Sequence, residues 1–158
     1  MNKRIIFRSV ILIAGIMLSQ IGCATMPEAT GAENDKSAAA VRAVLDAQVA
    51  AWNRGDIEEF MKGYERAETI VFVSGDNVTR GWQTVMDRYR KNYGSREKMG
   101  TLAFTELEIK PLSPFYATAV GRWQLTRAGD TPHGRFTLIF RRTTDGWRIV
   151  HDHTSSAQ

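Results

Sequence analysis

Three stretches of the chain repeat apolar residues at helical spacing. In the first, the apolar positions are spaced i, i+3, i+4, i+8 and i+11, which predicts a helix with one buried face: Val41, Val44, Leu45, Val49 and Trp52. Gln48 falls on the same face, so we expect a polar group among buried side chains. Ser37 is the predicted N-cap of this helix, and Gly55 ends it.

Two further helices follow. Asp56 and Glu59 have the spacing of a capping box, which predicts a second helix. Its apolar face consists of Ile57, Phe60, Met61 and Tyr64. A third helix is predicted from Trp82 to Tyr93, ending at Gly94, with Trp82, Val85, Met86, Tyr89 and Tyr93 on its apolar face.

Most of the remaining chain has the pattern of β-strands. Thr69–Val73 is rich in β-branched residues and ends at a turn over residues 74–77. Residues 101–110, 115–125, 135–142 and 147–154 alternate, and the Asp145–Gly146 pair suits a tight hairpin turn between the last two. Helices followed by a long antiparallel sheet predict an α+β domain, with three helices packed on one sheet face.

The last hairpin holds two of the three histidines. If it closes symmetrically at Asp145–Gly146, Phe140 pairs with His151 and Leu138 pairs with His153. Strand alternation then puts both histidines on the inner face, together with Phe136, Leu138, Phe140, Trp147 and Ile149. Asp152 falls on the opposite face, which disfavours an Asp–His relay within the strand. A bulge of one residue would invert every position beyond it.

The N-terminal segment has the features of an export signal. Basic residues precede a run from Ile11 to Ile21 that is almost wholly apolar, and Gly22–Cys23 follows. Gly22–Cys23–Ala24 resembles a bacterial lipoprotein cleavage site, which implies a lipid on Cys23 and a place in the cell envelope, at the outer membrane in a Gram-negative cell. Ordinary cleavage after Ala24, which would leave a periplasmic protein, and a retained membrane helix are the alternatives. We therefore expect a signal peptide at 1–23, a flexible tether at 24–36 and one domain at 37–158.

Charge and cysteine content narrow the function class further. The leader holds three of the 21 basic residues and none of the 17 acidic ones, so the rest of the chain carries 18 basic and 17 acidic residues. This near-neutral balance gives no reason to expect nucleic acid as a partner. Cys23 is the one cysteine, so no disulfide is expected.

Four segments together resemble the nuclear-transport-factor-2-like superfamily, and most closely its SnoaL-like and ketosteroid-isomerase-related bacterial branch. They are Trp52–Asp56, Gly81–Trp82, Phe136–Arg142 and Gly146–Ser155. The resemblance implies a cystatin-like cone, in which a curved sheet wraps round the helices and encloses a pocket. It also implies a homodimer through the outer sheet face.

The resemblance can be tested against ketosteroid-isomerase chemistry, which needs a tyrosine on the first helix and two aspartates on strands. Aligning the matching segments puts Gln48, Phe72 and Leu138 at these three positions. Since all three groups are replaced, the steroid-isomerase reaction is disfavoured. The residues expected to line the pocket are Gln48, Trp52, Tyr89, Trp123, Leu138, His151 and His153.

His153 is the candidate catalytic residue, because an imidazole can exchange a proton near neutral pH. A structural role, with a hydrogen bond to a group such as Gln48, is the alternative. His151 and His153 also have the spacing of two metal ligands on a strand, but His133, the remaining histidine, is expected to point outward. We therefore expect neither a metal nor another cofactor.

Three functions remain open. The first is a tethered envelope domain that binds a small apolar molecule without chemistry. The second is a small isomerase, dehydratase or hydrolase that uses His153 as general acid or base. The third is a dimerisation module with an unused pocket.

Overall fold

The computed structural model describes residues 30–157. The predicted signal peptide, the lipidation residue Cys23 and the tether up to residue 29 lie outside this range. The described helices are α1 (Gly31–Arg54), α2 (Ile57–Met61), α3 (Trp82–Asn92) and α4 (Arg96–Met99). The strands are β1 (Val71–Ser74), β2 (Asn77–Arg80), β3 (Thr101–Pro111), β4 (Tyr116–Thr126), β5 (His133–Thr143) and β6 (Gly146–Thr154). None of the helices within residues 30–157 is long and apolar enough to cross a membrane.

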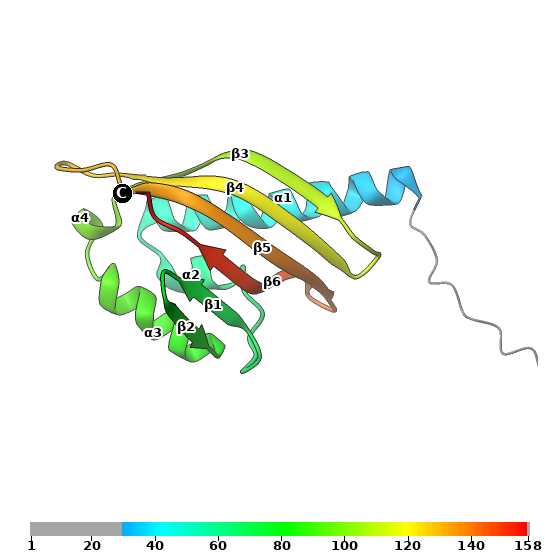
Figure 1. Cartoon of the computed structure of the whole chain (residues 1–158), viewed down its shortest axis with the longest axis horizontal. Coiled ribbons are helices and arrows are strands. Elements are labelled where there is room, and N and C mark those ends of the chain that lie inside the picture. The colour runs from blue at the N-terminus through cyan, green and yellow to red at the C-terminus, as the bar shows by residue number, and fades with distance from the viewer. Residues whose placement is uncertain (1–29, 158) are drawn as a thin grey trace, which may run out of the picture.

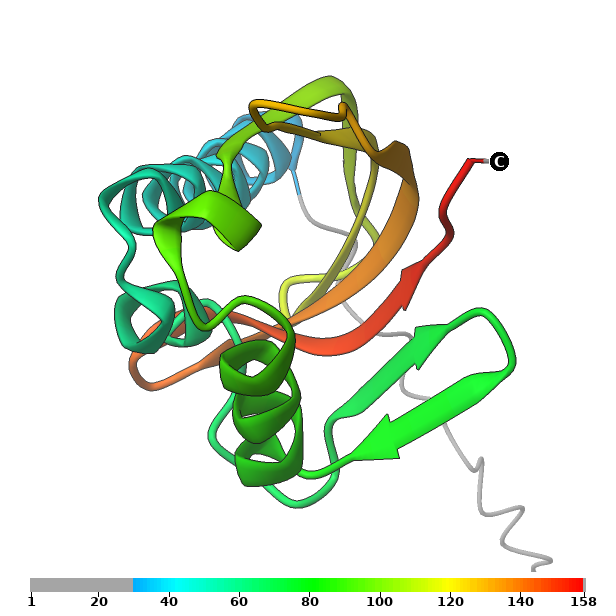
Figure 2. The same ribbon diagram turned by 90° about the vertical axis from the view of Figure 1, so that its left-hand side faces the viewer.

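The predicted α+β class with helices on one side of a curved sheet is confirmed (Figures 1 and 2). The six strands follow the order β2-β1-β6-β5-β4-β3. All neighbouring strands are antiparallel except β1 and β6, which are parallel, so the prediction of a purely antiparallel sheet is wrong at this pair. Strand β2 was also missed, because it has only four residues, which are mostly exposed and do not alternate between apolar and polar.

The start of α1 differs from the prediction. The helix begins at Gly31, with Thr30 as N-cap, so residues 31–36 are helical rather than part of a tether. Ser37, the predicted cap, is buried inside the helix. Extending a packed helix by another turn is easier than starting one, so polar residues ahead of the apolar face can join it. At the other end, Gly55 caps the helix at a φ of 83°.

The predicted cap of α2 is confirmed. The backbone N–H of Glu59 donates a hydrogen bond of 2.8 Å to Oδ1 of Asp56. This short helix then turns the chain back toward the sheet. The Tyr64 segment pairs with β6, since Ile149 N–H donates to the Gly63 carbonyl at 2.8 Å and Glu65 N–H donates to the Ile149 carbonyl at 2.9 Å.

Two strands carry a β-bulge. In β3 the register shifts between Thr105 and Glu108, and Glu106 has a positive φ of 52°. In the β5–β6 hairpin, Phe140 pairs with Ile149 whereas Ile139 pairs with His151, which leaves Val150 as the extra residue. A bulge of this kind reverses the face of every residue beyond it and increases the local twist.

The predicted pairing of the last hairpin is therefore wrong in two respects. The turn lies one residue earlier in the chain than predicted, since Thr143 pairs with Gly146, and Phe140 pairs with Ile149 instead of His151. This first error leaves the inward face unchanged up to Ile149. The second error is the bulge at Val150, beyond which Leu138 pairs with Asp152 and Thr137 with His153. Asp152 therefore points inward, and the two histidines do not.

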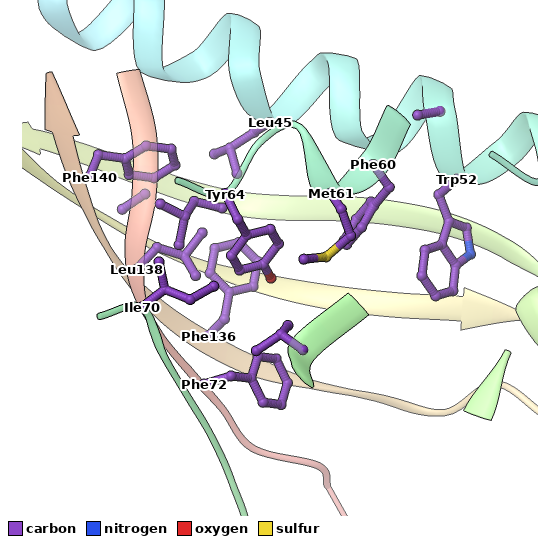
Figure 3. Close-up of a cluster of buried hydrophobic side chains, with 14 of the residues drawn as sticks. Leu45, Trp52, Phe60, Met61, Tyr64, Ile70, Phe72, Phe136, Leu138 and Phe140 are labelled. Carbon is purple, nitrogen blue, oxygen red and sulfur yellow. The ribbon is translucent and has the colours of Figure 1, made fainter. Parts of the chain in front are cut away.

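The apolar core lies between the helices and the concave face of the sheet (Figure 3). Leu45 from α1, Met61 from α2 and Phe140 from β5 have no exposed surface. Tyr64 is drawn among these side chains with its hydroxyl pointing away from its backbone into the cluster. The core around Phe140 is thus apolar, and the hydroxyl of Tyr64 is a polar group within the cluster.

Candidate functional site

A cavity of about 130 Å³ opens inside the cone, between the helices and the concave face of the sheet. Its walls are mostly aromatic and aliphatic. They are formed by Trp52, Phe60, Phe72, Tyr93, Leu102, Phe104, Trp123, Leu125, Phe136, Leu138 and Ile149. The polar lining groups are Gln48, Tyr64, Ser74, Arg88, Tyr89, Asn92, Asp152, Thr154 and Ser156. An apolar cavity with a few polar groups is the usual form of a small-molecule site.

Asp152 is the buried carboxyl group of this cavity, with 4% of its surface exposed. The Tyr64 hydroxyl donates a hydrogen bond of 2.6 Å to its Oδ2. The Thr154 hydroxyl donates one of 2.6 Å to its Oδ1. Both oxygens therefore have a hydroxyl donor, which holds the carboxyl group in one orientation.

A second tyrosine extends this arrangement. The hydroxyls of Tyr64 and Tyr89 lie 3.3 Å apart, and both residues line the cavity. Since the Tyr64 proton points to Asp152, the hydroxyl of Tyr89 is the donor in this contact. We call Asp152, Tyr64 and Tyr89 the carboxyl–tyrosine chain. It gives a mostly apolar cavity a connected set of groups that can donate or accept a proton.

Burial changes the proton affinity of all three groups. The loss of water raises the pKa of Asp152, although the hydrogen bonds from Thr154 and Tyr64 and the charges of nearby histidines oppose this shift. Burial also raises the pKa of Tyr64 and of Tyr89, with the negative charge of Asp152 adding to the effect. The tyrosines therefore remain protonated donors at neutral pH, and the carboxyl group holds its proton more tightly than an exposed aspartate does.

The backbone around Tyr64 fixes the chain in place. Tyr64 lies beside β6 because Gly63 and Glu65 share backbone hydrogen bonds with Ile149. Gly63 leaves room for Gln48, since a Cβ at this glycine would lie 2.6 Å from the Gln48 amide group. The amide of Gln48 in turn donates to the carbonyl of Phe60 at 3.2 Å. Gln48 therefore supports the turn that carries Tyr64, and among the described residues its side-chain hydrogen bond goes to Phe60 rather than to His153.

Five of the residues predicted to line the pocket do lie on the cavity wall: Gln48, Trp52, Tyr89, Trp123 and Leu138. His151 and His153 do not, so the prediction that they point inward is wrong. His153 is exposed and His151 is half-buried on the opposite side of the strand. The cause is the bulge at Val150, which reverses the face of the residues after it.

The sequence reasoning missed Asp152 as a site residue and did not single out Tyr64. Tyr64 was placed on the apolar face of the second helix, and its buried hydroxyl was a signal that it needs a polar partner. Asp152 could have been found by asking which residues would turn inward if the last strand contained a bulge. Nothing in the apolar pattern of β6 favours that alternative.

The opening of the cavity is polar. Asn92 at the end of α3 and Ser156 after β6 are exposed and still line the cavity, so they mark its mouth. Arg88 lies on the same face of α3, one turn before Asn92, with its guanidinium carbon 5.1 Å from the centre of the Phe72 ring. The cavity therefore has an acid–base group inside and a cation near its entrance.

Within residues 30–157, no group of three or more His, Cys, Asp or Glu residues is placed to bind a metal ion. The chemistry that these residues themselves offer is hydrogen bonding and proton transfer along the carboxyl–tyrosine chain.

Comparison with known structures supports the fold. An NTF-2 like protein of unknown function from Shewanella oneidensis MR-1 is 42% identical, with a TM-score of 0.71, over 74% of this chain and 97% of that one. A ketosteroid isomerase-like protein from Erwinia carotovora atroseptica is 18% identical, with a TM-score of 0.64, over 78% and 98% of the two chains. A domain of unknown function with a cystatin-like fold from Nostoc punctiforme is 18% identical, with a TM-score of 0.66, over 82% and 80%. The latter two show the fold alone.

The search of curated proteins finds no match. The family described as SnoaL-like domain matches residues 41–158, which span the second half of α1, the whole sheet and all residues of the cavity wall. The expected nuclear-transport-factor-2-like fold is confirmed by this match and by the solved structures. The chain therefore belongs to the SnoaL-like domain family.

Proposed function

We propose that this protein binds a small, largely apolar molecule with one carbonyl or hydroxyl oxygen and moves a proton on it by general acid–base catalysis. The observation that carries the proposal is the buried carboxyl group of Asp152, hydrogen-bonded to Tyr64 inside an apolar cavity. A carboxyl group whose pKa is raised by burial in a cleft is a frequent feature of catalytic sites. Asp152 replaces His153 as the candidate acid or base.

The size of the cavity limits the ligand. A dry apolar cavity of about 150 Å³ accepts one benzene molecule. The cavity here is about 130 Å³, so it suits a ligand with one ring or a short branched chain. A fused multi-ring molecule would require the walls to open. Cavity size is therefore a second reason, besides the absence of the steroid-isomerase residues, to disfavour the steroid-isomerase reaction.

The groups of the cavity suit two roles. In its ionised form Asp152 can take a proton from a carbon or hydroxyl of the ligand, and in its neutral form it can return one. The hydroxyl of Tyr89 can rotate from Tyr64 to donate to the ligand oxygen, where negative charge develops as a carbon proton leaves. The reaction class that fits is proton abstraction next to a carbonyl, as in isomerisation or dehydration.

Exchange of the α-protons of a small cyclic ketone, cyclohexanone, in deuterated water would test the proposal. We expect the purified protein to accelerate the exchange, and Asp152→Asn to reduce the acceleration by about 10²–10⁴-fold, the usual contribution of a general acid or base. The matched control is His153→Ala, which lies one residue away on the outer face and should leave the rate unchanged. Exchange that survives in Asp152→Asn, or is lost in His153→Ala, would refute the catalytic role of Asp152.

Binding without chemistry is the second candidate, because the cavity wall is mostly apolar whatever Asp152 does. Cyclohexanone that perturbs the amide resonances of the cavity residues, with no accelerated exchange, would favour this function. Displacement of resonances outside the cavity alone would argue against both.

Homodimerisation through the outer sheet face stays a proposal with one supporting observation. Tyr116 and Val120 on β4 point to the outer face, and they are 43% and 40% exposed. Apolar groups gathered on an exposed sheet face commonly mark an interface. Light scattering at micromolar concentration should give the mass of a dimer, and Val120→Glu should give that of a monomer. A monomer in both cases would exclude this function.

The lipid anchor at Cys23 and the envelope location likewise stay predictions. Labelling cells with a palmitate analogue would test them, because label should enter the protein and be absent from Cys23→Ser.

A further inference from the structure

We propose that Arg88 makes the cavity selective for ligands that carry a carboxylate at the end nearest its mouth. This inference rests on the proposed function, since it names the class of molecule that the same cavity accepts. Arg88 is the one cationic side chain among the described residues that line the cavity, and Asp152 is the one acidic side chain. The two lie at different parts of the wall, with Asp152 on β6 and Arg88 on α3.

Arg88 has no carboxylate partner within residues 30–157, unlike its neighbour on the helix. Arg90 forms ion pairs with Glu58 at 2.6 Å and with Asp87 at 3.8 Å. No ion pair of this kind involves Arg88, and its guanidinium instead lies over the Phe72 ring, with a carbon-to-centre distance of 5.1 Å. Stacking on an aromatic ring orients a guanidinium and leaves its N–H donors free at the edges.

The position of Arg88 suits binding to a charged group of the ligand rather than a role in the carboxyl–tyrosine chain. Arg88 and Tyr89 both line the cavity, and the charge of Arg88 opposes the upward shift in the pKa of Tyr89. The hydrogen-bond partners of the Asp152 carboxyl group among the described residues are Tyr64 and Thr154, not Arg88. A guanidinium that serves neither a surface carboxylate nor Asp152 is available to a charged group of the ligand.

The other groups at the mouth fit a carboxylate. Asn92 lies one turn after Arg88 on α3 and can donate from its amide, and Ser156 offers a hydroxyl. A planar carboxylate is the group that a guanidinium binds with two parallel hydrogen bonds. A ligand with a carboxylate at the mouth and one ring inside would match both the charge and the size of the cavity.

A pair of probes separates charge from shape. Phenylacetate and its neutral amide, phenylacetamide, differ little in volume, and binding of each can be followed by the amide resonances of the protein in low salt. We expect phenylacetate to bind about tenfold or more tightly than phenylacetamide, which is the size of effect of one charge-assisted hydrogen bond. The preference should shrink in high salt, because Arg88 lies near the solvent.

Two variants assign the preference. Arg88→Gln should abolish the difference between the probes and leave the affinity for phenylacetamide nearly unchanged. Arg90→Gln is the matched control on the same helix and should retain the preference. If Arg88→Gln destabilises the fold, Arg88→Lys keeps the charge and should retain a preference that is smaller than that of the original protein.

The possible outcomes separate this inference from the proposed function. Equal affinity for both probes, or a preference that survives in Arg88→Gln, would overturn the role of Arg88 and leave the cavity as a binding site. Failure of both probes to perturb any cavity residue would overturn the inference, whereas the proposed function is decided separately by the exchange of cyclohexanone protons. A carboxylate preference that follows Arg88 in a protein without ketone exchange would support the inference and contradict the catalytic proposal.

Discussion

The bulged strands β3 and β6 belong to the same sheet but present different side chains to its concave face. After the β3 bulge, Leu107 and Ile109 turn inward and pack against the apolar core. After the β6 bulge, Asp152 and Thr154 turn inward and bring a carboxyl group and a hydroxyl into the cavity. A bulge therefore only changes which residues face inward. The type of the residues that follow it determines whether the concave face gains apolar packing or polar site groups.

The largest expected effect comes from making β3 resemble β6. Leu107→Asp would place a carboxyl group after the β3 bulge without the hydroxyl donors that Tyr64 and Thr154 supply in β6. We expect a loss of about 3–5 kcal/mol in the free energy of unfolding, from lost packing and from a poorly hydrogen-bonded carboxylate. Urea denaturation would measure it. Leu112→Asp, at a side chain that is 57% exposed, is the control and should change stability by less than about 0.5 kcal/mol. Equal losses of stability for the two variants would contradict the conclusion that β3, unlike β6, cannot accommodate an inward carboxyl group.

The next effect concerns the hydroxyl donors themselves. Tyr64→Phe removes the 2.6 Å hydrogen bond to Asp152 and should cost about 1.5–3 kcal/mol, the range for a bond to a charged group. It should also raise the pKa of Asp152, because that bond favours the ionised form. Tyr89→Phe removes only the longer contact of 3.3 Å and should cost less. Chemical denaturation of both variants would rank their losses in the free energy of unfolding. A larger loss for Tyr89→Phe would contradict a chain in which Tyr89 donates to Tyr64 and Tyr64 donates to Asp152.

The pH dependence of stability separates the β6 carboxyl group from an ordinary aspartate. Burial raises the pKa of Asp152 in the folded protein above its unfolded value, near 3.8. The stability that the protonated carboxyl group contributes is therefore fully present below the unfolded pKa and is lost as the pH rises through the folded pKa. Ionised Asp152 therefore weakens the fold at neutral pH. Asp152→Asn should melt at a higher temperature than the original protein at pH 7, with a gain that shrinks toward pH 4. A difference in melting temperature that does not change with pH would refute the raised pKa.

The smallest effect is expected at the β3 bulge itself. Glu106 has a φ of 52°, a conformation that glycine adopts without strain. Glu106→Gly relieves this strain but loses the exposed ion pair with Arg135, so the two effects partly cancel. We expect a change within about 1 kcal/mol in thermal or chemical unfolding. A loss of several kcal/mol would mean that the bulge depends on its side chain.

The two bulges also differ in what the sequence reveals. The inward apolar residues of β3 are Leu102, Phe104, Leu107 and Ile109. The spacing of three between Phe104 and Leu107, within a strand that otherwise alternates, is a visible sign of an inserted residue. In β6 the inward residues change from Ile149 to Asp152, so the apolar pattern simply stops. Alternation alone then favours the histidines as the inward pair.

The fold class, the helix faces and the family were predictable because they depend on apolar patterns that extend over many residues. Five predicted residues on the cavity wall follow from the same patterns, as with Trp52 on the face of α1. The carboxyl–tyrosine chain was not predictable, because its members come from the α2–β1 connection, from α3 and from the residues after a bulge. Their contact depends on a register shift of one residue, which hydrophobic periodicity does not reveal.

The most direct test of this account is the titration of the Asp152 carboxyl carbon by NMR, assigned by comparison with Asp152→Asn. We predict a pKa above the ordinary value of 3.8, and ring resonances of Tyr64 and Tyr89 that shift with the same midpoint. A midpoint at or below 3.8, with no response of the two tyrosines, would show that the carboxyl group faces water and would contradict the placement of Asp152 in the cavity.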